Sequence, residues 1–274
     1  MLRTRAITAL LLLAVLLPIV FLAPPLWLGW FFALAVALAA WEWARLLGIS
    51  GATAVGYGAL ALLVLAGCQA FAKGPGQSIS QPAWIASAAF WAVYVPWMLF
   101  NGVRKFRLPE QAGLLIAGLL ILPACWLALM AARERGIAYM LSLLVLVWAA
   151  DVGAYFAGKA FGRRKLAERI SPGKTVEGAI GGLLLALGAS AAAAASGLVE
   201  PTFFGAALAR HGWVWACAVL VLLVAASIAG DLFESLLKRQ AGVKDSSGLL
   251  PGHGGVLDRI DALLPVLPLA MLLN

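Results

Sequence analysis

Three aspartates near the C-terminal end of the sequence could together bind a divalent cation. Asp231 lies at the end of one apolar stretch, and Asp258 and Asp261 lie at the start of the next. Because residues three apart on a helix share a face, we expect Asp258 and Asp261 to point to the same side. Carboxylates suit Mg²⁺, which takes further ligands from substrate phosphates and water. The three residues are therefore the predicted metal ligands for phosphoryl-type chemistry.

The residues between these aspartates supply positive charge and tight turns. Residues 230–261 read GDLFESLLKRQAGVKDSSGLLPGHGGVLDRID. Lys238, Arg239 and Lys244 could neutralise phosphate charge, and the glycines around His253 permit close backbone turns. His253 itself could bind phosphate, transfer a proton or cap a turn.

Two other interpretations of this segment explain less of it. In the first interpretation, Asp258, Arg259 and Asp261 pair locally in a solvated helix start. Asp231 and the GHGG turn then have no role. A serine hydrolase would need a GxSxG elbow around its nucleophile, and Ser235 is not in such a sequence. The pattern favours a metal-assisted site.

A second basic element, SPGKT at residues 171–175, precedes the seventh apolar stretch. It is not a Walker P-loop, because the position that must be glycine is Glu168. Free backbone N–H groups at a helix start, Gly173 and the point charge of Lys174 would nevertheless suit an anion. The alternative is a plain helix start whose lysine only marks the inner side of the membrane.

Asp151 lies inside the sixth apolar stretch, in the sequence WAADVGAYFAGKAFG. A carboxylate within a membrane is costly and faces the interior of a helix bundle or a wet cavity. Two roles are open, a part of the substrate site or a pairing partner for a basic residue on another helix. The small residues that follow predict close approach of a neighbouring helix: Gly153, Ala154, Ala157 and Gly158.

The composition places all these residues in a membrane protein. Of 274 residues, 64% are hydrophobic and 12% are charged, and the mean hydropathy is +0.98, outside the globular range. Nine spans of about 20 residues leave no room for a separate soluble domain. The net charge of +8 comes from short basic runs between apolar stretches, which indicates membrane topology and no nucleic-acid partner. Widely spaced Cys68, Cys125 and Cys217 predict neither a disulfide scaffold nor a zinc cluster.

The sequence predicts an all-α, polytopic integral membrane protein with about nine transmembrane helices. The first apolar run lacks a signal-peptide cleavage site, so we expect it to remain as a helix. Of the 20 Lys and Arg residues, 16 fall on one side of the spans, which predicts a cytoplasmic N-terminus and an outside C-terminus. The four on the outer side are Lys73, Arg133, Arg135 and Arg210. The predicted spans lie near residues 7–23, 26–46, 52–72, 83–100, 111–130, 137–157, 177–198, 213–234 and 256–273.

The polar residues divide the chain into two predicted regions. Residues 1–136 contain no aspartate and would form helices 1–5, a transmembrane scaffold. All five aspartates lie in residues 137–274, the predicted catalytic region of helices 6–9. Two basic loops of this region that contain glycine, 158–176 and 235–255, would face the cytoplasm, where nucleotides are found.

Taken together, these motifs resemble the phosphatidate cytidylyltransferase, or CDP-diacylglycerol synthase, family. The C-terminal resemblance is carried by S-L-L-K-R-x4-K-D, H-G-G and D-R-x-D within residues 235–261. The SPGKT element and the D-x-x-x-Y pattern of Asp151 and Tyr155 are similar to upstream motifs of the family, so the resemblance covers roughly residues 148–273. Val176 departs from the family pattern, in which an aromatic residue is common at this position.

The resemblance implies a homodimeric enzyme of the inner cell membrane, whose active site faces the cytoplasm and membrane lipid. It would convert CTP and phosphatidic acid into CDP-diacylglycerol and pyrophosphate, with Mg²⁺ and a potassium ion beside it. The implied metal ligands Asp231, Asp258 and Asp261 are, with Lys244, the predicted catalytic residues. The predicted substrate-binding residues are Asp151, Ser171, Lys174, Thr175, Lys238, Arg239, Asp245, His253 and Arg259.

Two other functions stay open at this point. A CTP-dependent polyprenol or phytol kinase resembles the family distantly and would release CDP, but the full K-R-x4-K-D and H-G-G-x-x-D-R-x-D patterns argue against it. A transporter could use the buried carboxylates as a translocation site. Its two halves would be expected to be related, and residues 1–137 do not resemble the second half.

Overall fold

The computed structural model describes residues 2–72, 80–197 and 201–274, and most of them are helical, which confirms the all-α class. The first part of the chain contains α1 (Leu2–Leu22), α2 (Pro25–Leu46), α3 (Gly51–Ala72), α4 (Ser80–Ala89), α5 (Val95–Asn101) and α6 (Leu108–Glu134). A π-helical segment, Phe90–Tyr94, joins α4 to α5 in one rod. The second part contains α7 (Ile137–Phe161), β1 (Lys165–Ala167), β2 (Ser171–Thr175), α8 (Val176–Ser196), α9 (Phe203–Gln240), α10 (Leu257–Ile260) and α11 (Leu263–Leu273).

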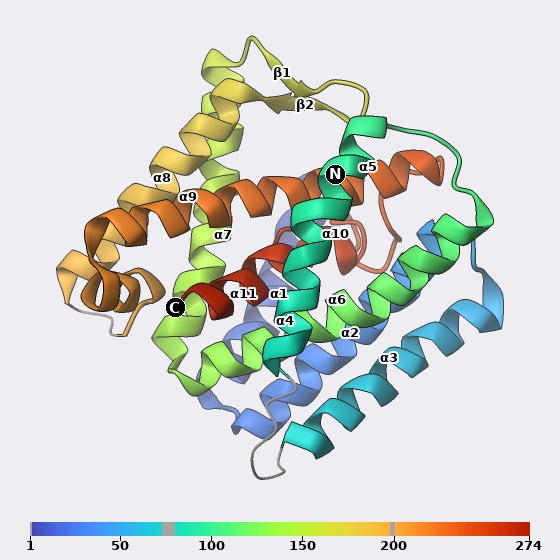
Figure 1. Cartoon of the computed structure of the whole chain (residues 1–274), viewed down its shortest axis with the longest axis horizontal. Coiled ribbons are helices and arrows are strands. Elements are labelled where there is room, and N and C mark those ends of the chain that lie inside the picture. The colour runs from blue at the N-terminus through green and yellow to red at the C-terminus, as the bar shows by residue number, and fades with distance from the viewer. Residues whose placement is uncertain (1, 73–79, 198–200) are drawn as a thin grey trace.

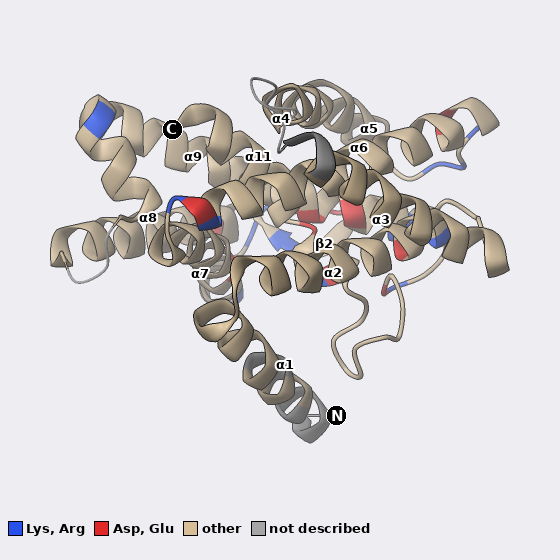
Figure 2. Cartoon of the chain, turned by 90° about the horizontal axis from the view of Figure 1, so that it is seen from below, with Lys and Arg blue, Asp and Glu red and all other residues tan. Residues whose placement is uncertain are grey.

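Seven helical segments of the described chain are long and apolar enough to cross a membrane, and they coincide with predicted spans two to eight. Figure 2 shows the long stretches of these helices that carry no charged residue, and α1 projecting from the bundle. The predicted number of nine crossings is not confirmed. Lys73, one of the predicted outer cations, lies outside the described residues. The segments are Pro25–Leu46, Gly51–Gln69, Ser80–Asn101, Leu108–Glu134, Ile137–Phe161, Val176–Ser196 and Phe203–Gln240.

The ninth predicted span, residues 256–273, is instead divided into the short helices α10 and α11. The backbone of Asp261 and Ala262, between the two helices, stays in the right-handed helical region, and α11 packs against α4, α6, α7 and α9 in the centre of the bundle (Figure 1). Pro265 has no N–H to donate to Asp261 four residues earlier, which weakens helical continuity after α10. The ninth crossing therefore stays a prediction.

Helices α7 and α8 pack closely through small residues, as predicted. A Cβ atom added at Gly153 would lie 2.7 Å from the carbonyl oxygen of Gly181, and one added at Gly178 would lie 2.8 Å from that of Ala154. Both distances are too short for a real side chain, so glycine permits this approach. The antiparallel β1–β2 hairpin connects the two helices at one end (Figure 1). The hairpin occupies most of the predicted loop 158–176.

Helix α9 extends beyond its predicted end. It is broken at Gly212 (φ +79°), so its membrane-crossing part begins at residue 213, as the sequence predicts. It then continues to Gln240, because Leu236 and Leu237 are fully buried in the core. The predicted loop 235–255 therefore begins only after residue 240, and Lys238 lies on the helix.

Candidate active site

The end of α9 and the short helix α10 bring together a cluster of charged side chains. Lys238 forms ion pairs with Glu234, one turn earlier on α9, and with Asp258 on α10, where Nζ lies 2.5 Å from Oδ1. The side chains of Glu234 and Asp258 are only 3% and 5% exposed, so an unpaired charge on either would be costly. Lys238, predicted to bind substrate, is thus engaged by the protein, and Glu234 is an acid that the sequence analysis did not single out.

The second carboxylate oxygen of Asp258 is held by the loop that precedes α10. Oδ2 accepts hydrogen bonds from the backbone N–H of Ser246 (2.9 Å), the hydroxyl of Ser246 (2.8 Å) and the N–H of Gly255 (2.7 Å). Gly254 has a φ of +82°, and a Cβ there would lie 2.6 Å from this oxygen. The orientation of this predicted metal ligand is therefore fixed through both of its oxygens.

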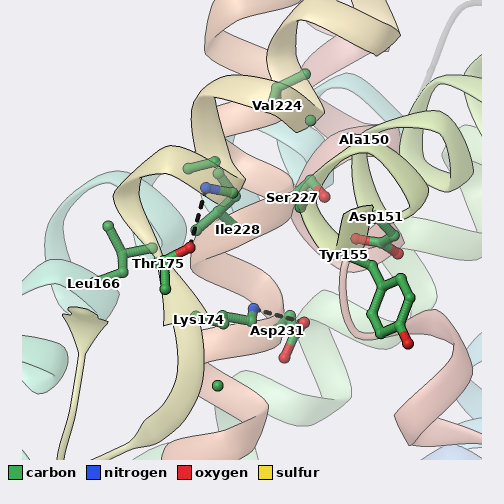
Figure 3. Close-up of a pocket in the computed structure, with 15 residues that line it drawn as sticks. Ala150, Asp151, Tyr155, Leu166, Lys174, Thr175, Val224, Ser227, Ile228 and Asp231 are labelled. Carbon is green, nitrogen blue, oxygen red and sulfur yellow. Dashed lines mark hydrogen bonds and ion pairs between the residues drawn. The ribbon is translucent and has the colours of Figure 1, made fainter. Parts of the chain in front are cut away.

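Asp231 and Asp261 lie on the other side of the cluster. The Nζ of Lys174, from the SPGKT element, lies 2.6 Å from Asp231 Oδ2 (Figure 3), and the Ser235 hydroxyl donates to Oδ1 at 3.3 Å. Asp261 lies close enough to Asp231 for their charges to interact. Gly230 permits this proximity, because a Cβ there would lie 2.5 Å from the Asp261 carbonyl oxygen.

The three predicted metal ligands share one region without forming a complete metal cage. Asp231 is paired with Lys174 and Asp258 with Lys238. Within the described residues, no group of three His, Cys, Asp or Glu side chains is arranged to hold one ion. The donor chemistry still fits Mg²⁺, which binds one or two carboxylates and completes its shell with water and substrate phosphates. The residues thus suit an ion that arrives with a phosphate-bearing substrate.

A cavity of about 310 Å³ opens beside Asp231, between α7, α8, α9 and β2, and we call it the helix cavity (Figure 3). Asp151 lines it and forms no ion pair with a basic residue of the described chain. The structure thus gives no support to the predicted pairing with a basic residue, and the part of Asp151 in a substrate site stays a prediction. The polar lining residues are Asp151, Tyr155, Lys174, Thr175, Ser227 and Asp231, and the apolar ones include Ala150, Ala154, Leu166, Ala179, Val224 and Ile228.

A second cavity, of about 450 Å³, lies in the loop between α9 and α10, and we call it the loop cavity. Lys244 and Asp245 line it, are exposed, and form no ion pair in the described chain. Arg259 donates a hydrogen bond to the carbonyl oxygen of His253 (2.7 Å) and so fixes the GHGG turn. The Nδ1 of His253 is buried and has no hydrogen-bond partner among the described residues.

The SPGKT element is a strand, where the sequence predicted a loop and a helix start with free N–H groups. Thr175 accepts a hydrogen bond from the N–H of Gly178 (3.1 Å) and caps α8, while the N–H of Val176 donates to the Arg164 carbonyl (2.9 Å). These N–H groups are occupied because the hairpin pairs β2 with the chain that follows α7. Ser171, the first residue of β2, lines neither cavity.

Arg239 holds two segments of the backbone together. Its guanidinium donates to the carbonyl oxygens of Ile170 and Val243, at 3.4 Å in each case. These contacts join the end of α9 to the turn of the β1–β2 hairpin. The structure thus gives this predicted substrate-binding residue a structural role in the protein.

Sequence reasoning missed a buried acid from the N-terminal half. Glu42 on α2 is fully buried and accepts hydrogen bonds from Ser246, Ser247, Val256 and Leu257. The one available signal was a carboxylate inside an otherwise apolar span, which is costly unless it has partners. Its partners lie more than 200 positions away, and a single sequence does not reveal such a contact.

Comparison with known proteins agrees with the motifs. The chain matches the Cytidylyltransferase family over residues 3–274. A protein named phosphatidate cytidylyltransferase from Pseudomonas aeruginosa is 41% identical over 278 residues, which cover 98% of this chain and 95% of the relative. Proteins of that name from Haemophilus influenzae and Bacillus subtilis are 49% and 41% identical over 135 residues, which cover 49% of this chain and 44% and 46% of those relatives. The chain belongs to the cytidylyltransferase family.

Proposed function

We propose that this enzyme is a phosphatidate cytidylyltransferase, which transfers CMP from CTP to phosphatidic acid and releases pyrophosphate. The observation that carries the proposal is the relative of that name, which aligns with 98% of the chain. The geometry supports it as well, since lysines and carboxylates lie beside a cavity between apolar helices and a cavity in a polar loop. A reaction between a lipid and a nucleotide needs both kinds of environment.

Phosphatidic acid is assigned to the helix cavity. Its apolar wall comes from helices long enough to cross a membrane, so it suits the glycerol and the first part of the acyl chains. Lys174 lies at the polar end, where its charge would attract the lipid phosphate. That phosphate would replace Asp231 as a partner of Lys174 and leave the aspartate oxygens free to ligate a metal.

CTP is assigned to the loop cavity. Lys244 and Arg259 supply positive charge, and His253 has an unpartnered ring nitrogen for a hydrogen bond. The loop lies outside the seven segments of the described chain that are long enough to cross a membrane, and its Lys244 and Asp245 are exposed, which supports access by a soluble nucleotide. The Lys238–Asp258 pair stands on the helices that flank this loop.

In the proposed reaction, a phosphate oxygen of phosphatidic acid attacks the α-phosphorus of CTP. A new P–O bond forms to the lipid phosphate, the bond from the α-phosphorus to the bridging oxygen breaks, and pyrophosphate leaves with that electron pair. The attacking phosphate is already ionised, so the protein needs no nucleophile and no general base. Lys174 and Lys244 contribute by holding the two phosphates in line and offsetting their charge.

The proposed cofactor is Mg²⁺, held by Asp231, Asp258 and Asp261 together with substrate phosphates; a potassium ion beside it is proposed from the family resemblance. Bound Mg²⁺ supplies charge neutralisation on the reacting and leaving phosphates. The supporting observation is the chemistry of the donors, three carboxylates around a cluster that already contains two lysines. For Asp258 to ligate the ion, Lys238 must release its Oδ1, because Oδ2 is saturated by the loop.

The proposed setting is the inner cell membrane, with the site facing the cytoplasm. The distribution of basic residues supports this orientation. Asn274 accepts a hydrogen bond from Arg135 and donates one to Tyr139, so it lies beside the α6–α7 turn. This supports the prediction that the turn and Asn274 are on the outer side of the membrane. The family resemblance supports a homodimer, which native mass spectrometry in detergent would test.

The test of the proposed function is pyrophosphate release by purified protein in detergent, with CTP, Mg²⁺ and phosphatidic acid each omitted in turn. Release that requires all three supports the proposal. Release of CDP with a polyprenol acceptor would instead assign a lipid kinase. No nucleotide turnover, together with solute flux in proteoliposomes, would assign a transporter.

A further inference from the structure

We propose that Glu42, on the N-terminal helix α2, is a positioning residue that orients Asp258 without touching substrate or metal. The inference deepens the proposed function, since it concerns the same site. It also gives a functional role to the region that the sequence predicts to be scaffold. The chain of contacts runs from Glu42 to the loop before α10 and from that loop to Asp258.

Both oxygens of the Glu42 carboxylate are fully used. Oε1 accepts from the hydroxyl of Ser247 (2.5 Å) and the N–H of Val256 (3.0 Å). Oε2 accepts from the hydroxyl of Ser246 (3.1 Å) and the N–H of Leu257 (2.6 Å). A carboxylate offers about four lone-pair sites: three of these donors belong to Glu42 alone, and the single proton of the Ser246 hydroxyl is shared with Asp258 Oδ2. Because the side chain is fully buried, water does not replace a lost donor.

Two of these donors are the first N–H groups of α10. Val256 precedes the helix and Leu257 begins it, so their N–H groups have no acceptor within the helix. Glu42 therefore caps α10 from a different helix, a role that a side chain of the same segment usually fills. With only four residues, Leu257–Ile260, α10 has few internal hydrogen bonds to define its direction. Its direction, and that of Asp258 on it, depends on this external cap.

Ser246 and Gly255 link the two carboxylates. The hydroxyl of Ser246 lies between Glu42 Oε2 (3.1 Å) and Asp258 Oδ2 (2.8 Å), and the N–H of Gly255 donates to Asp258. A Cβ at Gly255 would overlap both the Ser246 hydroxyl and Glu42 Oε1, so the loop is tightly packed between the two acids. A shift of Glu42 therefore displaces the groups that orient Asp258.

The principal test is Glu42→Gln in the full-length protein. The amide keeps the size of the side chain but has one acceptor oxygen, so two of the four donors lose their acceptor. We expect amide hydrogen exchange in residues 246–257 to accelerate about tenfold or more, because one broken buried hydrogen bond is already worth about that factor. We also expect kcat to fall about tenfold or more, while KM for CTP and for phosphatidic acid stays within about twofold.

The matched control is Glu110→Gln, which removes another acid of the N-terminal half. The polar partners of Glu110 in the described chain are Arg104 and the N–H of Arg107, outside residues 246–257, so both the exchange pattern of that segment and kcat should match the wild type. Glu42→Asp, which keeps the carboxylate but shortens its reach, should recover part of the kcat that Glu42→Gln loses. A merely structural role would give no such graded recovery together with a local change in exchange.

Three results would overturn the proposal. They are wild-type kcat in Glu42→Gln, a loss of kcat with unchanged exchange in residues 246–257, and faster exchange with unchanged kcat. Should Glu42→Gln give no folded protein, Ser247→Ala decides, since it removes one donor to Glu42 and none to Asp258. Exchange is then read at residues 255–257, because the Ser247 hydroxyl also accepts from the N–H of Leu249. Faster local exchange with reduced kcat supports the proposal, and wild-type behaviour rejects it. A wild-type protein that releases no pyrophosphate would refute the proposed function, whereas the exchange comparison would still report on Glu42.

Discussion

At the scale of single residues, the candidate site contains ion pairs with which the substrates of the proposed reaction would compete. Lys174 is paired with Asp231, and Lys238 lies between Glu234 and Asp258. These pairs offset buried charge in the absence of a substrate, and an incoming phosphate competes for the same lysines. Lys244 differs, because it is exposed and forms no ion pair in the described chain, although the carboxylate of Asp245 lines the same cavity.

Asp258→Ala should abolish nearly all turnover. The change removes a proposed metal ligand and leaves Lys238 with Glu234 as its one remaining ion-pair partner among the described residues. Loss of a preorganised charged group of this kind typically lowers kcat by about 100-fold or more. Pyrophosphate release at saturating Mg²⁺ measures the effect, with Glu110→Gln as control. Activity above about a tenth of the wild type would remove Asp258 from the metal site.

Lys174→Gln and Lys244→Gln should separate the two substrates. Lys174 lines the helix cavity, so its loss should raise KM for phosphatidic acid about tenfold, the factor of one charge-assisted hydrogen bond. Lys244 lines the loop cavity, so its loss should raise KM for CTP instead. Steady-state kinetics with one substrate varied at a time gives both values. The matched control is Lys105→Gln, because Lys105 is exposed and lies far along the sequence from both cavities. If Lys174→Gln and Lys244→Gln changed both KM values equally, the assignment of the two cavities would be contradicted.

The sequence predicted which residues lie in the candidate site better than which of them contact each other. The motifs pointed to Asp231, Asp258 and Lys174, and the structure places these residues in or beside one charged cluster. The sequence did not show that the lysines pair with the acids, because such pairing depends on how α9, β2 and α10 meet in space. Glu42 was missed for the same reason, since its role arises only from contacts across more than 200 positions.

At the scale of elements, the apolar stretches of the sequence predicted the positions of the helices. They did not predict whether lipid or protein surrounds each helix. Predicted spans two to eight coincide with long helices. The ninth coincides with α10 and α11, which are separated where Pro265 removes a backbone hydrogen bond. The β1–β2 hairpin was read as a loop, since its strands of three and five residues are too short for a recognisable alternation.

Gly182→Ala should loosen the α7–α8 unit, whereas Gly188→Ala on the same helix should not. A Cβ at Gly182 would overlap the carbonyl oxygen of Ala150, while one at Gly188 meets nothing within 4 Å. We expect Gly182→Ala to lower the free energy of unfolding by about 1–3 kcal/mol and Gly188→Ala to leave it unchanged or raise it by up to about 1 kcal/mol. Thermal unfolding in detergent compares the two. Equal midpoints would show that α7 and α8 can move apart without cost.

At the scale of the whole molecule, the basic residues predict one orientation in the membrane. Single cysteines can test it in a background in which Cys68, Cys125 and Cys217 are replaced by alanine. A membrane-impermeant maleimide should label Arg210→Cys in intact cells and Lys244→Cys only after the membrane is opened, because both positions are exposed but lie on opposite predicted sides. The reverse pattern would place the loop cavity outside, away from cytoplasmic CTP.

The contact between α2 and the loop before α10 also constrains how the protein is made. Glu42 is translated 204 residues before Ser246, an interval of roughly 10–40 s at ordinary rates of synthesis. During that time α2 enters the bilayer with a carboxylate whose four native donors do not yet exist. Assembly of the N-terminal half is therefore completed only when the final part of the chain leaves the ribosome, and a nascent chain that stops before residue 246 presents an unsatisfied acid to membrane quality control.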